Sequence, residues 1–331
     1  MKAIQFIAGN TIVAEEREVA TPAATGRDVL VKIEAIALNP VDTKVRPDAG
    51  EDDAILGYDA AGTVVAVGDE VTTLAVGDAV YHAGDIRRPG SNAEFQLVDE
   101  RIVGKRPSSL DAASAAALPL TSLTAWEALH DRLGICPDGK HAGKSLLIIG
   151  GAGGVGSIAI QLAKRAGLRV IATASRGAST DWCRGLGADH VVNHGDPLRP
   201  QIGQLGLDHV DYIANFHSTD QYWQTMGDLI APQGRVVLIV EPSTPLDFGG
   251  DYKRKSVSVS WEFMFTRSMF ATEDMGKQAE ILNTIAALVD AGELRSTIGK
   301  VLGKISARNL IEAHELIETN RTVGKLVLED W

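Results

Sequence analysis

The sequence predicts an α/β protein in which a mostly β N-terminal domain precedes a doubly wound parallel sheet. Two patterns indicate this fold: short apolar runs separated by glycine turns up to about residue 100, and strands that alternate with helices from residue 145 onward. The length of 331 residues favours two domains over one. We expect a mostly β domain over residues 1–123, a parallel-sheet domain over residues 124–268, and a C-terminal segment over residues 269–331 that returns to the first domain.

The N-terminal domain is predicted from short runs of β-forming residues. Gly68-Asp69 and Gly77-Asp78 provide turns between these runs, because glycine tolerates the backbone conformations that tight turns require. The predicted strands cover residues 3–7, 29–36, 62–67 and 78–82.

Strands and helices alternate through the middle of the chain, which predicts a parallel sheet covered by helices on both faces. The predicted strands cover residues 145–149, 169–174, 191–192, 210–214 and 235–240. One predicted helix ends at residue 166, and two others lie near residues 180–186 and 221–229. The C-terminal segment contains predicted helices over residues 278–290 and 307–318 and a closing strand over residues 325–328.

A period of two indicates one further strand, over residues 256–265, with one buried face. At a sheet edge this strand could pair with a second copy of the chain, so we expect a homodimer. The alternative is an edge strand that only faces the core. The side chains expected on the buried face are Val257, Val259, Trp261, Phe263 and Phe265, and those expected on the other face are Ser256, Ser258, Ser260, Glu262 and Met264.

Composition limits the classes of function. The 43 acidic and 32 basic side chains give a formal charge of −11, which disfavours binding to nucleic acid or to a membrane. Two cysteines, Cys136 and Cys183, are too few for a disulfide framework or a cysteine-rich zinc module. The first residues show no signal-peptide pattern. We therefore expect a cytoplasmic protein that acts on a small-molecule substrate.

A glycine-rich turn follows the predicted strand 145–149 and opens a helix. Gly151, Gly153 and Gly156 fill a GxGxxG pattern, and Gly154 and Val155 complete the turn. Such glycines permit a tight turn, close approach of a pyrophosphate and close helix packing, and the helix N-terminus holds the phosphates. The pattern predicts a Rossmann domain that binds a dinucleotide. The alternative is a turn with a purely structural role.

The end of the second strand in this domain bears on the choice of dinucleotide. An NAD site usually has Asp or Glu there for the ribose 2′-hydroxyl, whereas this chain has Ser175 and Arg176. A hydroxyl and a guanidinium suit a 2′-phosphate through charge-assisted hydrogen bonds. We therefore expect NADPH as the cofactor, the alternative being that Arg176 is a solvated loop residue.

Several ordered motifs are shared with a known family. They are residues 39–44 (NPVDTK), 57–62 (GYDAAG), 76–80 (VGDAV), 93–95 (AEF), 118–125 (LPLTSLTA) and the glycine turn. Together they resemble the medium-chain dehydrogenase/reductase superfamily, specifically its zinc-free quinone oxidoreductase, or zeta-crystallin-like, branch. The resemblance covers nearly the whole chain and implies that the N-terminal domain is chaperonin-10-like.

Residues 261–268 (WEFMFTRS) and 187–190 (GADH) resemble a subgroup often labelled zinc-binding alcohol dehydrogenases. In zinc enzymes of the superfamily a cysteine stands at the position of Asn39 and a histidine at that of Tyr58, and the structural-zinc cysteine cluster is absent from this chain. Zinc prefers thiolate and imidazole ligands. His190 and His194 have helix-like ligand spacing, but a predicted strand separates them. We expect no bound metal.

The resemblance also implies a catalytic cleft lined by Asn39, Lys44 and Tyr58, which offer an amide, an ammonium and a phenol to the developing oxyanion. Tyr58 is the expected proton donor. Each residue also has a structural alternative: Asn39 as a turn residue before proline, Lys44 as a solvated cation, and Tyr58 as a packed ring.

Further cofactor contacts follow from the resemblance alone. Thr124 is expected beside the nicotinamide and His194 near the dinucleotide, while Asn320, with Arg321 and Lys325, is expected to add to the 2′-phosphate pocket. Thr124 could instead cap a helix, and His194 could be a solvated loop residue.

The main hypothesis is an NADPH-dependent, zinc-independent reductase that transfers hydride to a quinone or an α,β-unsaturated carbonyl. Loops 47–53 and 85–90 are expected to shape the acceptor pocket. A zinc-dependent alcohol dehydrogenase is the alternative within enzymes. A cofactor-binding, crystallin-like protein without significant turnover is the alternative class, and although some such relatives bind RNA, the charge of −11 argues against RNA here.

Overall fold

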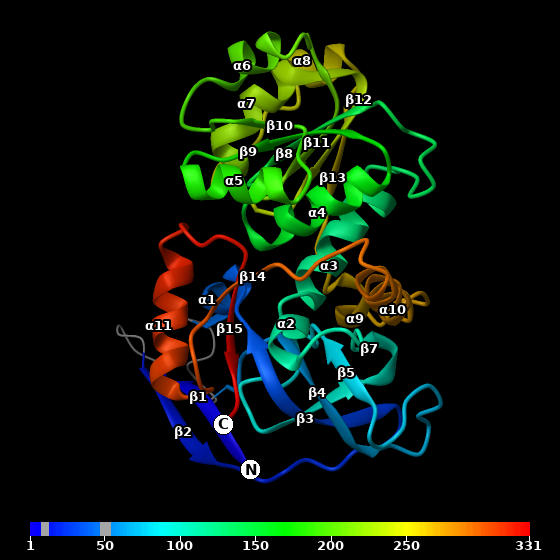
Figure 1. Ribbon diagram of the computed structural model, residues 1–331, viewed down its shortest axis with the longest axis vertical. Coiled ribbons are helices and arrows are strands. Elements are labelled where there is room, and N and C mark those ends of the chain that lie inside the picture. The colour runs from blue at the N-terminus through cyan, green and yellow to red at the C-terminus, as the bar shows by residue number, and fades with distance from the viewer. Residues whose placement is uncertain (8–12, 47–53) are drawn as a thin grey trace. The chain divides into compact units, whose positions relative to one another are not determined.

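The computed structural model describes residues 1–7, 13–46 and 54–331, and its chain divides into two compact units (Figure 1). Unit 1 combines Met1–Leu123 with Met264–Trp331, and unit 2 is the continuous stretch Thr124–Phe263. The second boundary thus lies before residue 264, not after residue 268 as expected. The reason is that Met264 and Phe265 are buried in unit 1, where Gln278 donates a hydrogen bond to the Met264 carbonyl.

Unit 1 is built on a seven-stranded sheet in the order β14-β15-β3-β4-β5-β7, with β6 paired to β3. The central strand β3 pairs antiparallel with β4, β6 and β15, so a C-terminal strand lies beside an early one (Figure 1). The strands are β3 (Asp28–Ala37), β4 (Asp59–Val67), β5 (Ala79–His82), β6 (Phe95–Asp99), β7 (Val103–Lys105), β14 (Ile298–Val301) and β15 (Lys325–Glu329), and a separate pair is formed by β1 (Lys2–Ile7) and β2 (Val13–Glu18).

The helices of unit 1 come from both the N-terminal and the C-terminal part of the chain. Helix α11 (Ala307–Glu318) places Leu310, Ala313 and Ile317 in one apolar stripe, which packs in the same core as Val31 and Ile33 of β3. The other helices are α1 (Pro40–Val45), η2 (Glu100–Ile102), α2 (Ala112–Ala116), α3 (Pro119–Trp126), α9 (Thr266–Met269) and α10 (Lys277–Asp290). Helix α3 begins in unit 1 and ends in unit 2.

Unit 2 contains a six-stranded parallel sheet in the order β10-β9-β8-β11-β12-β13. Figure 1 shows α4 and α5 on one side of this sheet and α6, α7 and α8 on the other. The strands are β8 (Ser145–Ile149), β9 (Arg169–Thr173), β10 (His190–Val192), β11 (Val210–Asn215), β12 (Ile230–Leu238) and β13 (Ser258–Trp261). The helices are the π-helix η3 (Glu127–Arg132), α4 (Gly154–Arg165), α5 (Gly177–Gly185), α6 (Leu198–Gln204), α7 (Thr219–Leu229) and α8 (Gly250–Arg254).

This strand order confirms the predicted fold class, a doubly wound parallel sheet joined to a mostly β unit. Strand β8 is buried along its whole length, as expected for a strand covered on both faces. The order of the strands reverses at β8, because β9 and β11 lie on its two sides. Ligands of such sheets bind at this reversal, outside the carboxyl ends of the strands.

The predicted strand over residues 256–265 is shorter, and its burial pattern changes phase. Val257 and Val259 pack against the core as expected, but Trp261 is 47% exposed, whereas Glu262 is buried. The phase changes because the Glu262 carboxylate forms an ion pair with Arg132, at 2.9 Å, and turns inward. As β13, the strand lies at one end of the sheet, the edge position that was expected.

Candidate functional site

The glycine turn lies at the carboxyl end of β8, and Gly150 begins it with a φ of +87° that favours glycine. The turn is fixed to β9 by two hydrogen bonds: Gly150 N–H donates to Thr173 Oγ1 at 3.1 Å, and Gly151 N–H donates to the Thr173 carbonyl at 3.2 Å. These bonds hold the turn at the carboxyl end of the sheet, at the central strand where the strand order reverses.

The three glycines of the motif meet different surroundings. A Cβ atom on Gly151 would lie 2.8 Å from Cβ of Ala172, and one on Gly156 would lie 2.8 Å from Cα of Gly151. A Cβ atom on Gly153 would meet nothing closer than 3.5 Å. Gly151 and Gly156 are thus required by packing, whereas Gly153 leaves open space at the start of the helix, where a pyrophosphate would approach.

Helix α4 presents free backbone amides at this open space. Its first intrahelical bond runs from Ser157 N–H to the Gly153 carbonyl, so the amides of residues 154–156 precede the hydrogen-bonded turns. No acidic side chain occupies the first turn of α4. The helix N-terminus therefore suits an anion.

The carboxyl ends of β9 and β10 place Arg176 and His194 near the same turn. Arg176 is exposed, and among the described residues its guanidinium has no hydrogen-bond or ion-pair partner. His194 Nδ1 lies 3.4 Å from Thr173 Oγ1, the oxygen that also binds the Gly150 amide. Burial, His217 and Arg176 lower the pKa of His194 below its usual value. Ser175 is exposed beside Arg176.

One further residue at the carboxyl end of this sheet was not expected from the sequence. His217 follows β11, the strand next to β8, and its Cβ lies 3.5 Å from the position of a Cβ on Gly150. Its ring centroid lies 6.5 Å from that of His194. Burial lowers the pKa of His217 below its usual value, which favours the neutral ring. His217 lies two residues after β11, which pairs with β8. This position at the carboxyl end of a neighbouring strand was the signal that could have identified it.

A second group of polar side chains is buried in unit 1. Lys325 is 3% exposed, and its Nζ atom donates to Asp59 Oδ2 at 2.8 Å, to the Leu38 carbonyl at 2.7 Å and to Asn39 Oδ1. Asn39 Nδ2 donates to Asp59 Oδ2 at 2.9 Å and to the Ala37 carbonyl at 3.4 Å. Lys325 therefore has no donor left for a 2′-phosphate, and that expectation was wrong. The Asn39 amide is also engaged by protein oxygens on both of its polar atoms.

Asp42 adds a buried carboxyl group to this cluster. Its Oδ2 atom accepts a hydrogen bond from Asn39 N–H at 2.6 Å, and so begins α1, a helix that the sequence pattern did not predict. For the other oxygen, Oδ1, no hydrogen-bond partner is found among the described residues. Burial raises the pKa of Asp42 to about 7, against the lowering effects of the Asn39 amide and Lys325.

Tyr58 immediately precedes β4 and is 4% exposed. Its ring packs against that of Phe265, with centroids 5.0 Å apart. Burial raises the pKa of the Tyr58 hydroxyl well above its usual range, and the charges of Asp42 and Asp85 act in the same direction. The phenol is therefore protonated across the physiological pH range and can act as a neutral donor.

The remaining expected site residues lie in different settings. Lys44 is exposed on α1, outside the buried cluster. Thr124 is buried inside α3, so it does not cap that helix. Asn320 follows α11 with a φ of +55°, the left-handed conformation that ends many helices. Arg321 is exposed.

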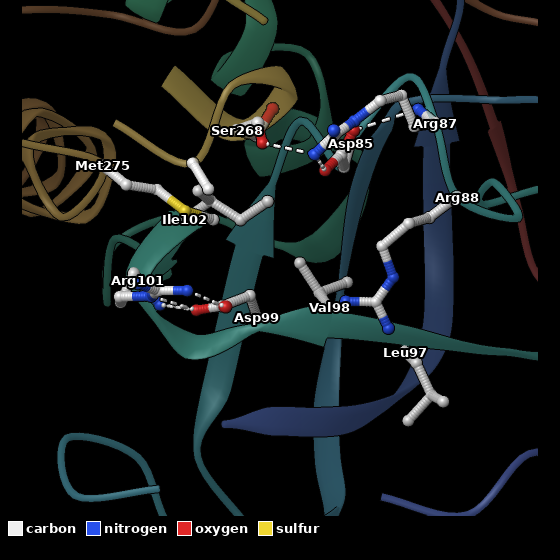
Figure 2. Close-up of a pocket in the computed structure, with 11 residues that line it drawn as sticks. Asp85, Arg87, Arg88, Leu97, Val98, Asp99, Arg101, Ile102, Ser268 and Met275 are labelled. Atoms are coloured by element: carbon white, nitrogen blue, oxygen red, sulfur yellow. Dashed lines mark hydrogen bonds and ion pairs between the residues drawn. The ribbon is translucent and has the colours of Figure 1, made fainter. Parts of the chain in front are cut away.

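A pocket of about 190 Å³ lies in unit 1, lined partly by the loop of residues 85–90 (Figure 2). Figure 2 shows Arg87 joined to Asp85 and to the Ser268 carbonyl, and Arg101 joined to Asp99. Loop 47–53, also expected to shape the acceptor pocket, lies outside the described residues.

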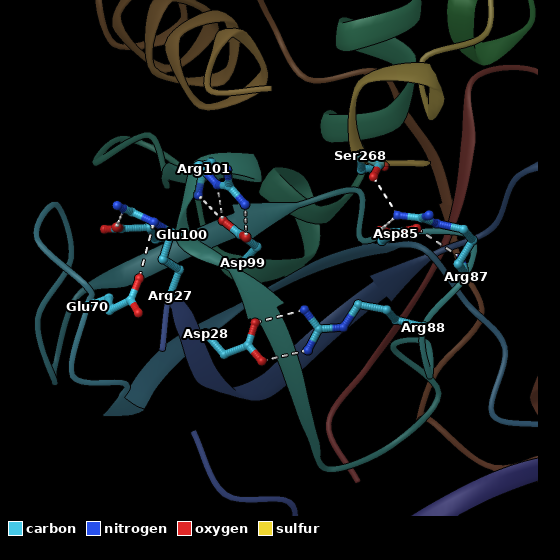
Figure 3. Close-up of polar contacts among 10 residues, drawn as sticks. All are labelled: Arg27, Asp28, Glu70, Asp85, Arg87, Arg88, Asp99, Glu100, Arg101 and Ser268. Carbon is cyan, nitrogen blue, oxygen red and sulfur yellow. Dashed lines mark hydrogen bonds and ion pairs between the residues drawn. The ribbon is translucent and has the colours of Figure 1, made fainter. Parts of the chain in front are cut away.

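Charges around this pocket are balanced pair by pair (Figure 3). Arg88 binds both carboxylate oxygens of Asp28, at 2.7 and 2.8 Å, and Arg27 binds Glu100 at 3.0 Å. Since each guanidinium has its own carboxylate or carbonyl partner, the pocket presents no excess positive charge. Asp85, which lines this pocket, also acts to raise the pKa of Tyr58.

Asn39, which the resemblance aligns with a zinc-ligand cysteine, has both of its polar side-chain atoms bound to protein groups. The Asn39 amide oxygen faces the Lys325 ammonium, and a second cation there would be repelled. The two cysteines lie in unit 2, Cys183 buried beneath Gly151. Within residues 1–7, 13–46 and 54–331, no group of three or more His, Cys, Asp or Glu residues could hold a metal ion.

Comparison with known proteins agrees with this architecture. Residues 25–108 match the family of alcohol dehydrogenase GroES-like domains, and residues 186–328 match a family described as zinc-binding dehydrogenase. A zinc-type alcohol dehydrogenase-like protein of Staphylococcus aureus (strain COL) is 44% identical over 322 residues, which is 97% of this chain and 95% of the relative. The chain belongs to the medium-chain dehydrogenase/reductase superfamily. It is thus a member of a family of oxidoreductases, with relatives among the quinone oxidoreductases.

Two other superfamily members differ in the activity that their names give. A 2-methylene-furan-3-one reductase of Solanum lycopersicum is 33% identical over 329 residues, covering 95% of this chain and 74% of the relative. The solved structure of a quinone oxidoreductase from Coxiella burnetii is 28% identical and has a TM-score of 0.80, covering 100% of this chain and 99% of the other. Among the residues described for this superfamily member, no helix is long and apolar enough to cross a membrane.

Proposed function

We propose that this chain is an NADPH-dependent reductase that transfers hydride to a quinone or an α,β-unsaturated carbonyl without using zinc. The observation that carries the proposal is the glycine turn between β8 and α4, which places free helix amides at the reversal of the strand order. A reductase of a conjugated ketone and a quinone oxidoreductase among the relatives support this class of acceptor.

The cofactor would be held by residues of unit 2. The α4 amides would bind the pyrophosphate and the Arg176 guanidinium the 2′-phosphate, while His194 and His217 would add polar contacts from the same end of the sheet. A bound nicotinamide supplies the hydride. Arg176 favours NADPH because a charge-assisted bond to a phosphate dianion offsets the free-energy cost of desolvating the guanidinium. A bond to a ribose hydroxyl does not.

Tyr58 is the proton donor in this proposal. Its hydroxyl stays protonated because burial and the nearby carboxyl groups oppose the phenolate. Reduction of an enone leaves an enolate, to which a neutral phenol can donate a hydrogen bond and then a proton, and the phenolate regains its proton from water. Asn39 has both polar atoms bound to protein groups, so we assign it the positioning of β4 and α1 around Tyr58.

The donor chemistry of these residues supports zinc independence. Asn39 and Tyr58 offer a hydrogen-bonded amide and a neutral phenol, and a lysine ammonium already contacts the amide oxygen. This part of the proposal disagrees with the names of several relatives, which describe zinc-type or zinc-binding proteins.

An assay of NADPH and NADH oxidation against quinones, enones, aldehydes and alcohols tests the function, with and without a chelator. We expect NADPH-dependent turnover of a quinone or enone that survives chelation. About one tightly held zinc per chain, with activity lost on its removal, would support the zinc-dependent alternative instead. Saturable NADPH binding without turnover of any acceptor would support the crystallin-like alternative.

We also infer a homodimer that forms through β13. Among the described residues this strand pairs only with β12, and Trp261 and Phe263 are 47% and 44% exposed. An unpaired strand edge flanked by aromatic rings favours pairing with a second copy across a two-fold axis.

A further inference from the structure

Lys325 makes the contacts of a bound cation rather than those of a surface lysine. Its ammonium group has three donors, and each reaches a different oxygen: the Leu38 carbonyl, Asn39 Oδ1 and Asp59 Oδ2. Asn39, Asp59 and Lys325 are each at most 3% exposed. The ammonium is therefore fully coordinated by protein oxygens and shielded from water.

The oxygens around Lys325 are of the kinds that coordinate hard metal ions. A backbone carbonyl, an amide oxygen and a carboxylate oxygen are ligands that magnesium, calcium and manganese accept. A second carboxyl group, Asp42, lies nearby. The charge of Lys325 lowers the pKa of Asp42, and the charge of Asp59 raises it. Without the lysine, the cluster would hold two buried carboxyl groups and no cation.

Strand pairing sets the position of this cation. Lys325 is the first residue of β15, and its N–H donates to the Thr297 carbonyl. The next residue, Leu326, accepts a hydrogen bond from Leu38 N–H at 3.0 Å, at the end of β3. Because side chains alternate along a strand, a slip of one residue would turn the ammonium to the other face.

We propose that Lys325 is a tethered cation that takes the place of a metal ion in unit 1, neutralising Asp59 and keeping divalent cations out of the cluster. The proposal rests on the zinc-independent part of the proposed function and extends it by naming the group that replaces the metal. A divalent ion would need Asn39 Oδ1 and Asp59 Oδ2, the two side-chain oxygens that the ammonium occupies.

The first test uses Mn²⁺ as the probe, because the cluster offers only oxygen ligands. Lys325→Ala removes the cation and opens space, and we expect it to bind about one Mn²⁺ at least about tenfold more tightly than the wild type in calorimetric titration. The double variant Lys325→Ala/Asp59→Asn is the matched control and should lose this gain. Equal Mn²⁺ affinities of Lys325→Ala and the wild type would overturn the proposal.

The second test applies even if Lys325→Ala does not fold. Lys325→Met keeps the length of the side chain and removes its charge, which leaves the Asp59 carboxylate buried without a cation. At one fixed pH near 7 its urea midpoint should therefore lie below that of the wild type. Lys325→Met/Asp59→Asn should recover much of this loss.

Both tests are independent of turnover. A Lys325→Met protein whose urea midpoint equals that of the wild type, or a double variant that recovers none of the loss, would overturn the role of the charge. Loss of wild-type activity on chelation would instead contradict the zinc-independent function, whatever the variants show.

Discussion

A Cβ atom on Gly156 would lie 2.2 Å from the carbonyl oxygen of Gly150. The first turn of α4 therefore packs directly on the backbone of the turn that precedes it. This contact fixes the direction in which the helix amides point.

Gly156→Ala should destabilise unit 2 and weaken dinucleotide binding together. A methyl group cannot fit at 2.2 Å from backbone oxygen, and overpacking of this kind costs about 1–3 kcal/mol or more. Thermal unfolding without cofactor measures the first effect, and NADPH fluorescence titration measures the second.

Gly153→Ala is the matched control, because its Cβ would meet nothing closer than 3.5 Å. It should leave the unfolding temperature near that of the wild type and weaken NADPH binding alone. Equal loss of stability in both variants would contradict the distinction between a packing glycine and an open one.

Arg176→Ala should remove most of a preference for NADPH over NADH. Hydrogen bonds to charged groups contribute about 1.5–3 kcal/mol, which is about ten- to a hundredfold in affinity. NADH affinity should change little. Arg184→Ala, in the exposed part of α5, is the control cation. Equal affinities of the wild type for the two cofactors would count against Arg176 as a selectivity residue.

Tyr58→Phe should slow reduction of enones while leaving NADPH affinity nearly unchanged, because the ring is kept and only the donor is lost. Removing one oxyanion donor costs about 2.7–4 kcal/mol in a well-organised site. Quinones should be affected less, since a reduced quinone spreads its charge over the ring and can take a proton from water. Steady-state rates for both acceptor classes measure the difference, and unchanged rates with all of them would leave Tyr58 with a packing role.

Trp261→Glu should shift the protein from dimer to monomer in light scattering at micromolar concentration. The charge would be placed beside the free edge of β13, where a second strand is expected to pair. Phe270→Glu, at a 70% exposed position in unit 1, is the control and should not change the mass. A wild-type protein that is monomeric would refute the dimer.

Two buried groups should give the stability of the protein opposite dependences on pH. Burial lowers the pKa of His82 to about 3, so its contribution to stability is present above pH 6.5 and is lost as pH falls toward 3. Burial raises the pKa of Asp42 to about 7, so its contribution is present below pH 3.8 and is lost as pH rises toward 7. Each unit of difference in pKa corresponds to about 1.4 kcal/mol.

Urea unfolding across this range separates the two groups. His82→Gln should make the free energy of unfolding fall more steeply with rising pH than in the wild type, because only the Asp42 effect is left. Asp42→Asn should make it rise more steeply with pH. Identical slopes for the wild type and both variants would show that neither group titrates as its burial implies.

Local patterns predicted the strands of unit 2 and its helices α4, α5 and α7, but not η3, α6 or α8. The strand 145–149, the glycine turn and the helix that follows are adjacent in the chain, and their geometry is set by neighbouring residues. The alternating pattern over residues 256–265 predicted which side chains are buried only as far as Ser260. Beyond it, Glu262 turns inward toward Arg132, a residue far away in the sequence, which no periodicity can indicate.

The candidate site in unit 1 shows the same limit more strongly. Tyr58 and Asn39 were identified from motifs, but the partners that determine their chemistry were not. Lys325 was assigned to a phosphate, whereas strand pairing between β15 and β3 carries it to Asp59. Such a register depends on the whole sheet, so the sequence reveals the residue types but not their contacts.

The discontinuity of unit 1 has a consequence for synthesis. Because β3 needs β15 as a neighbour, the larger sheet is completed only after residues 325–329 have left the ribosome, whereas unit 2 draws on one uninterrupted stretch. Domains generally fold as units while the chain is being made. The parallel sheet can therefore fold first. The early strands of unit 1 cannot complete their sheet, and Asp59 has no cation beside it, until residues 325–329 have been synthesised.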